Sequence, residues 1–244
     1  MAINELLVAG AVPTATAEGR NVDQRGDGRG NAFTRAMGKS APNAAASACY
    51  YMSRNAAVGT GATGVATTTG VSDTQALIHL FNNASSGGST ICLDYIKIRV
   101  GTAGLNGTTT GFFTKTYYGG TRYSSGGTAF TPQNCNAAST ATSSATLHVG
   151  AVLLGTANGT ERLLSAQALR SAIAVAGDHY WFDFGPNQMS AHNGLVVSGT
   201  AISNLVIPCC PVALAPQSGF QFGIYGASQD TAAVYEWEIG YYEL

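Results

Sequence analysis

Segments with the pattern of short β-strands recur along most of the chain, and they constrain its fold more than any other feature. In the closing segment, the apolar residues Trp237 and Ile239 alternate with Glu236 and Glu238. Alternation with a period of two places the two sets of side chains on opposite faces of a sheet. We therefore expect Trp237 to be buried between two sheets and the two glutamates to lie on the opposite face.

Similar segments are separated by turns rich in Gly, Ser and Asn. The candidate strands span residues 73–81, 90–100, 112–118, 145–154, 179–184, 194–198, 202–207, 220–225 and 233–242. Short strands at such regular spacing predict an all-β fold, a β-sandwich or jelly roll.

Two regions allow finer predictions. In segment 90–100, the apolar positions up to Tyr95 share one face and those from Ile96 onward share the other, which indicates a β-bulge between these two residues. Segment 161–176 has apolar residues four apart and fits either a helix or two short strands. We favour strands there because the neighbouring segments have strand patterns.

The first 54 residues differ in composition and contain six of the chain's 12 Lys and Arg residues. Their few apolar residues follow no sustained period, so this segment buries too little apolar surface to fold alone. We expect a partner to order it. The residues expected to contact that partner are Arg20, Arg25, Arg29, Arg35 and Lys39. With the Gly- and Thr-rich stretch 56–70 as a linker, residues 1–70 are expected to form an extended basic N-terminal arm, and residues 71–244 a jelly-roll β domain.

Charged residues make up only 10% of the chain, against about 25% in typical soluble domains. Thr, Ser, Asn, Gly and Ala must therefore fill many solvent-facing positions. Either a partner or further copies of the chain cover part of this surface, or it is a low-charge extracellular surface; composition leaves both open. Because so few charges protect the sheet edges, we expect a homo-oligomer.

The formal net charge of -1 argues against a dedicated nucleic-acid binder, and no run approaches the ~18 consecutive apolar residues of a membrane helix. The first 17 residues lack the basic start of a secretory signal and contain Glu5. Five scattered cysteines are too few for a disulfide framework. We expect a protein that is made in reducing cytoplasm and has no nucleic-acid or membrane partner.

Motifs for catalysis or cofactor binding are weak. Residues 59–64 match the dinucleotide pattern G-x-G-x-x-G, but they lie in a low-complexity stretch without the strand and helix that the pattern requires. Asp178-His179 is not accompanied by a nucleophile elbow. We therefore expect no catalytic residues, no cofactor and no enzyme activity. The four histidines lack metal-ligand spacing, although a metal site assembled from distant strands stays open; they are His79, His148, His179 and His192.

Several aromatic residues raise the alternative of a glycan site, because Tyr and Trp that expose a ring and a polar tip make sugar or protein contacts. They are Tyr117, Tyr118, Tyr123, Tyr180, Trp181 and Tyr225. Most of them lie at strand positions, where packing in the core or at a sheet edge is the ordinary role.

Three short stretches resemble the capsid decoration (cement) proteins of tailed bacteriophages. They are residues 80–83 (LFNN) with 85–88 (SSGG), the strand 91–100, and the closing run 220–244 with its sequence EWEIGY at 236–241. The order of an arm, a Gly/Thr linker and a strand-rich domain is similar too. The resemblance implies a jelly-roll domain that sits on the outer shell as a trimer, with arms that clamp neighbouring major capsid subunits. It implies no catalytic residues.

The residues and the resemblance together predict a non-enzymatic structural protein of the virion, assembled in the host cytoplasm and located on the capsid exterior. Its expected partners are the major capsid protein and further copies of itself, most simply in a homotrimer. The alternative is a carbohydrate-binding jelly-roll module for receptor binding or adhesion on a virion.

Overall fold

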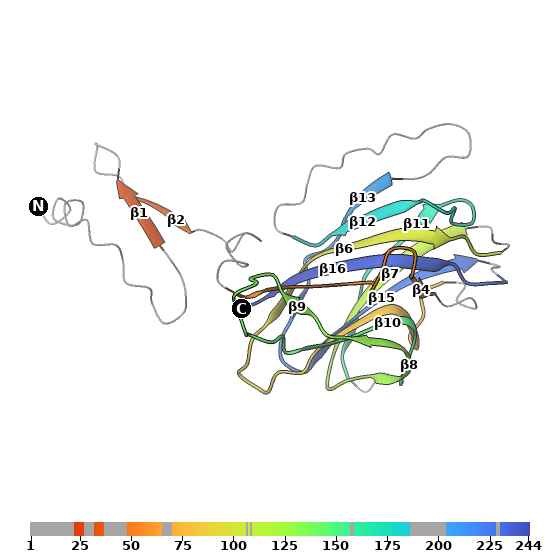
Figure 1. The fold of residues 1–244 in the computed structure, drawn as a ribbon. Coiled ribbons are helices and arrows are strands. Elements are labelled where there is room, and N and C mark those ends of the chain that lie inside the picture. The colour runs from red at the N-terminus through yellow and green to blue at the C-terminus, as the bar shows by residue number, and fades with distance from the viewer. Residues whose placement is uncertain are drawn as a thin grey trace, which may run out of the picture. The chain divides into compact units, whose positions relative to one another are not determined.

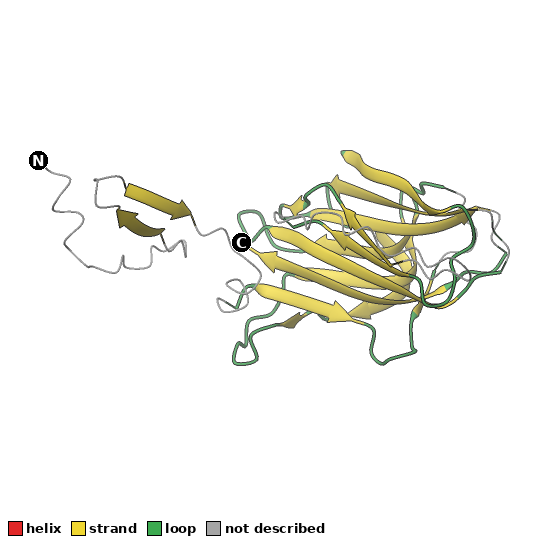
Figure 2. Ribbon diagram, turned by 90° about the horizontal axis from the view of Figure 1, so that it is seen from above, coloured by secondary structure: helices red, strands yellow, loops and turns green. Residues whose placement is uncertain are grey.

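The computed structural model describes residues 22–26, 32–36, 48–64, 70–105, 107, 109–156, 159–185, 204–227 and 230–244. The chain divides into two compact units, Met1–Ala44 and Ala45–Leu244. Figure 2 shows strands and loops, and no helix, among the described residues. Accordingly, none of them belongs to a helix that could span a membrane.

The second unit is a sandwich of two sheets (Figures 1 and 2). In order, the six-stranded sheet contains β11 (Glu161–Arg170), β7 (Thr109–Tyr118), β15 (Ser218–Ala227), β5 (Gln75–Asn82), β10 (Ala145–Leu154) and β8 (Tyr123–Phe130). The eight-stranded sheet contains β13 (Asn204–Pro208), β12 (His179–Asp183), β6 (Ile91–Thr102), β16 (Val234–Glu243), β3 (Tyr50–Arg54) and β9 (Gln133–Asn134). Its two remaining strands are β14 (Ala213–Leu214), which pairs with β6, and β4 (Ala62–Thr63), which pairs with β16. The all-β sandwich predicted from the sequence is confirmed.

The facing sides of the two sheets form the core. On β16, Tyr235, Trp237 and Ile239 are all buried, with Trp237 only 3% exposed. Phe130 from β8 packs edge-on against the Trp237 ring at 4.7 Å between centroids. Glu236 bonds outward to Arg99. The predicted faces of the closing strand are confirmed.

The predicted β-bulge in β6 is also confirmed, one residue earlier than expected. Tyr95 lies opposite Gly240 and Leu93 lies opposite Tyr241, so Asp94 is the extra residue. The bulge keeps Leu93 and Ile96 both in the core. Tyr95 was expected to share the face of Leu93, but the extra residue turns it to the outer face, where its ring meets Trp181.

Segment 161–176 contributes a single strand, β11, which pairs with β7, so the choice of strand over helix is confirmed. The predicted strand 202–207 corresponds to β13, which runs parallel to β12. The predicted strand 194–198 lies outside the described residues. Strands β3 and β8 were not predicted.

The boundary expected at residue 70 lies earlier in the structure. β3 pairs with β16 along its whole length, and Tyr51 is buried, with its ring stacked 5.9 Å from that of Tyr241. β4 also pairs with β16. Residues 50–63, assigned from the sequence to the arm and linker, are therefore part of the sandwich. In the first unit, β1 (Val22–Gly26) and β2 (Ala32–Ala36) form an antiparallel pair, so the arm is not extended throughout.

Candidate functional site

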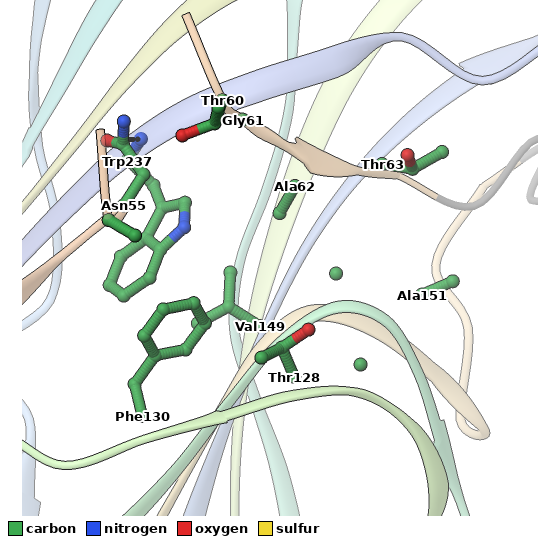
Figure 3. A pocket seen from close by; sticks show the side chains of 13 residues that line it. Asn55, Thr60, Gly61, Ala62, Thr63, Thr128, Phe130, Val149, Ala151 and Trp237 are labelled. Carbon is green, nitrogen blue, oxygen red and sulfur yellow. Dashed lines mark hydrogen bonds between the residues drawn. The ribbon is translucent and has the colours of Figure 1, made fainter. Parts of the chain in front are cut away.

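A pocket of about 440 Å³ opens between the edges of the two sheets (Figure 3). The rings of Phe130 and Trp237 lie at one end of it, and the small side chains of Ala62, Thr63 and Ala151 lie at the other (Figure 3). The pocket thus joins segments that are far apart in the sequence.

One wall exists because the chain leaves the sheet between β3 and β4. After Arg54 the backbone moves away from β16 and pairs with it again at Ala62. In the gap, Asn55 takes the place of a strand partner: its side-chain Oδ1 accepts from the N–H of Trp237 at 3.2 Å, and its own N–H donates to the carbonyl of Trp237 at 3.1 Å. No strand residue then covers this side of Trp237.

The opposite wall is a bulge shared by β8 and β10. Between the pairs Val149–Thr128 and Val152–Gly126, the two residues Gly150 and Ala151 on β10 face only Gly127 on β8. Gly127 has φ +65° and Gly150 has φ +117°, conformations that favour glycine. A Cβ on Gly150 would stand 3.7 Å from the carbonyl oxygen of Thr63, so the missing side chain keeps the space between the walls open.

The lining carries no ionisable side chain among its thirteen residues. Its polar side chains are partly engaged already. Asn55 Nδ2 donates to the carbonyl of Ala57 at 2.6 Å. Thr60 Oγ1 donates to the same carbonyl at 2.7 Å and accepts from the N–H of Ala57 at 3.1 Å. The pocket therefore offers an apolar floor, backbone groups and the hydroxyls of Thr63 and Thr128.

A second arrangement lies on the outer face of the eight-stranded sheet. Lys97 Nζ stands 4.6 Å and 4.4 Å from the ring centroids of Tyr95 and Trp181. Glu238 accepts from Lys97 at 2.9 Å and from the hydroxyl of Tyr95 at 2.6 Å. Burial and this bond to the carboxylate raise the pKa of Tyr95. Burial opposes ionisation of Glu238, but the bonds from Tyr95 and Lys97 outweigh it and lower the pKa of the carboxyl.

The outer face of the six-stranded sheet brings together two of the four histidines. His79 and His148 lie opposite each other on β5 and β10. His79 Nε2 lies 2.5 Å from the hydroxyl of Tyr117, and the Tyr123 ring stacks 3.7 Å from that of His148. Burial, with smaller effects of His148 and Arg122, lowers the pKa of His79 to about 3. No three His, Cys, Asp or Glu side chains in the described part of the chain gather as metal ligands, and His179 lies on the other sheet.

The charged groups near these histidines hold loops in place. Arg122 donates to the carbonyls of Asp73 and Gly155, both at 2.7 Å, and pairs with Glu161. Lys115 pairs with Asp73. Both cations are largely buried and tie the segments before β5 and after β10 to the sheet.

Other sequence-based candidates are dispersed. Arg25 lies on β1 opposite Phe33, and Arg35 lies on β2 opposite Asp23. Arg20, Arg29, Lys39 and His192 are outside the described residues. The six aromatic residues considered for a glycan site are split between the two sheets, and Tyr117 and Tyr180 are buried. The sequence offered no indication that Tyr95 would join Trp181.

The glycine-rich stretch 59–64 forms a turn and β4, without the βαβ unit of a dinucleotide site. The signal that could have revealed the pocket is the glycines at 126, 127 and 150, since glycine within a strand pattern indicates a bulge or a close backbone approach. No protein-family model, curated protein or solved structure gives a significant match to this chain.

Proposed function

We propose that this chain is a non-enzymatic structural protein of a bacteriophage, which binds the outer surface of the capsid and cements neighbouring major capsid subunits. The observation that carries the proposal is the division of the chain into an N-terminal unit, Met1–Ala44, and a separate β-sandwich. The N-terminal unit contains five of the chain's 12 Lys and Arg residues. The order of these parts supports the proposal because it matches the resemblance to cement proteins.

In this proposal the N-terminal unit binds carboxylates on the capsid through charge-assisted hydrogen bonds from its Arg and Lys side chains. A capsid repeats the same site many times, and linked contacts raise the overall avidity above that of any single one. An oligomer centred on a symmetry axis, most simply a homotrimer, uses this repetition best.

A structural role is also supported by how the sandwich uses its buried charges. Arg122 and Lys115 bind loops, and Arg170 pairs with the buried Asp178 at 2.8 Å. These side chains have the hydrogen-bond partners expected of groups that hold the fold together.

The test is co-sedimentation with capsid shells assembled from the major capsid protein of the same phage. Exchanging Arg20, Arg25, Arg29, Arg35 and Lys39 for glutamine should lower the affinity for shells at least tenfold. The matched control exchanges Arg54 and Arg99 of the sandwich for glutamine and should bind as the parent does. Equal binding by both variants would remove the N-terminal unit from the mechanism; no binding by the parent would reject the function itself.

A second candidate function, a carbohydrate-binding module on a virion, has support from the outer face of the eight-stranded sheet. Tyr95 and Trp181 are both part-exposed there, with ring centroids 5.7 Å apart. Part-exposed Tyr and Trp side chains are suited to contacts with sugars or proteins, and Lys97 over both rings adds a hydrogen-bond donor. A glycan array with the parent and with Trp181→Ala tests this candidate: binding that the variant loses would favour it, and an array without binding would reject it.

A further inference from the structure

We propose that the pocket beside Trp237 binds an extended, uncharged segment of a partner protein and takes one bulky apolar side chain of that segment. The proposed function names the partner, a capsid subunit, and to that extent the inference rests on it. The chemistry of the occupant follows from the pocket itself.

The floor of the pocket fits an apolar side chain. Phe130 and Trp237 pack edge to face and Val149 adjoins them (Figure 3). At about 440 Å³, the pocket lies in the range of ligand sites, roughly 300–1,000 Å³. A charged side chain would lose its hydration there without meeting an opposite charge, because the lining has no ionisable group.

The small number of side chains available for hydrogen bonding in the pocket favours a peptide over a sugar as its ligand. A sugar needs several side-chain donors and acceptors around its hydroxyl groups. Asn55 and Thr60 already bond to Ala57. The other polar side chains of the lining are the two hydroxyls of Thr63 and Thr128. Trp237 is only 3% exposed and therefore cannot present its ring face as a stacking platform.

The rims of the pocket offer backbone groups instead. Among the described residues, β8 pairs only with β10, and β4 pairs only with β16. Within this part of the chain, each strand has an edge without a partner strand, and an extended peptide can bind such an edge through its main chain. Residues 124–129 of β8 are exposed and carry no charge, whereas edge strands that avoid pairing usually carry Lys or Pro.

The glycine at position 150 keeps the two rims apart. A Cβ there would already be in van der Waals contact with Ala62 and Thr63 on the other rim, so the missing side chain leaves the pocket open. The bulge lies in the pairing of β8 with β10 and borders the pocket, so a side chain of the bound segment would enter there while its main chain follows the free edge of β8.

The probe is a blocked, uncharged heptapeptide, TATWTAT, titrated into the full chain to about 1 mM, where even weak binding is detectable by NMR. We expect shifts of the backbone amides of Gly127, Gly150 and Thr63. The same peptide with alanine or glutamate at its centre should shift them at least five-fold less. Absence of shifts with TATWTAT, equal shifts with all three peptides, or equal shifts with maltose would each overturn the proposal.

A pair of variants locates the site. Thr128→Trp places a large ring at the pocket and should weaken TATWTAT binding at least tenfold. The control Thr140→Trp, at an exposed loop position outside the lining and outside β8, should leave binding unchanged. The amide spectrum of each variant shows whether it is folded. If Thr128→Trp misfolds, Ala151→Leu fills the pocket from β10, on the same wall, and carries the same expectation. Equal binding by a folded pocket variant and by the Thr140→Trp control overturns the assignment.

Co-sedimentation with capsid shells separates the two proposals. Shell binding by the parent together with undiminished binding by Thr128→Trp would remove the pocket from the contact and leave the proposed function standing. Peptide binding at the pocket without any shell binding would reject the proposed function and leave the peptide-binding pocket standing.

Discussion

Trp237 links three parts of the sandwich through one side chain and its peptide group. Its ring packs on Phe130 from the other sheet, and its backbone bonds to Asn55, where the chain leaves the sheet. Truncation to alanine would open a cavity and enlarge the adjoining pocket.

We expect Trp237→Ala to lower the free energy of unfolding by about 3–5 kcal/mol, as truncation of a large core side chain does. The control Glu236→Ala, on the opposite face, removes only the bonds to Arg99 and Gly59 and should cost about 1 kcal/mol or less. Urea unfolding measures both. A Trp237→Ala protein as stable as the parent would show that the ring contributes little to the core.

His79 should make the sandwich sensitive to acid. Unfolded histidine binds a proton near its ordinary pKa of 6.5, but buried His79 does so only near 3. Between these values the unfolded state binds more protons, so stability falls as the pH falls. At pH 4.5, His79 alone should lower the free energy of unfolding by about 2–3 kcal/mol relative to pH 7.

The measurement is urea unfolding of the parent and of His79→Gln across this pH range. The variant loses a bond to Tyr117 and can be less stable at pH 7, so the comparison is of slopes. A slope that His79→Gln leaves unchanged would assign the acid sensitivity to other groups, such as His148, whose pKa burial also lowers.

At the scale of single elements, the bulge of β8 and β10 depends on glycine. A Cβ on Gly127 would meet Val152 Cγ2 at 2.7 Å and the carbonyl oxygen of Val149 at 3.1 Å. Gly87, with φ +82°, has no atom within 4 Å of such a Cβ. Gly87→Ala therefore reports the backbone cost alone, about 1 kcal/mol.

We expect Gly127→Ala to destabilise the sandwich by about 1 kcal/mol more than Gly87→Ala does, because steric overlap adds to the backbone cost. Thermal and urea unfolding of the two variants test this difference. Equal stabilities would mean that the bulge relaxes to accommodate a side chain.

The elements that the sequence predicted are those with strong contrast between their faces. β16 alternates apolar and charged residues, and in β6 the apolar residues change from one face to the other, which indicated the bulge. β3 lacked this signal, since Tyr50 and Tyr51 are adjacent and both buried. β8 lacked it for the opposite reason: the middle of the strand is Ser, Gly, Thr and Ala, all exposed.

The glycines at 126, 127 and 150 could have indicated the bulge, but the rest of the pocket was beyond prediction because it depends on tertiary contacts. Asn55, Phe130, Val149 and Trp237 come from four segments that meet only once both sheets have formed. The pairing of His79 with His148 is similar, as it requires the register of β5 against β10. Local patterns contain no information on such registers beyond the face on which each residue lies.

At the scale of the whole molecule, trypsin should distinguish the two units. Arg25 and Arg35 lie in the N-terminal unit, whereas Arg54 lies in β3, paired with β16. Limited digestion of the free protein should remove part of the first unit and yield a resistant fragment that still contains residues 50–54. Mass spectrometry identifies the cut sites. Early cleavage after Arg54 would contradict its place in the sheet, and protection of the N-terminal sites on capsid shells is expected from the proposed function.

We also expect self-association. Charged residues make up only 10% of the chain, so few charges protect the sheet edges from contacts between copies. Light scattering over a tenfold dilution should give a mass about three times 25.0 kDa. A mass that stays at 25.0 kDa in solution would restrict any trimer to the capsid surface. Isolated single copies on imaged capsid shells would reject the trimer altogether.

The position of β16 has a consequence for the order of synthesis. This strand follows every other strand in the sequence, yet it lies between β6 and β3 in the middle of its sheet. During translation, β3 and β6 emerge early, and both lack their pairing partner until β16 has been synthesised. Pairings over such long sequence separations form slowly and leave strand edges open in the meantime. We therefore expect the eight-stranded sheet to close only after β16 has left the ribosome, with the nascent chain depending on chaperones until then.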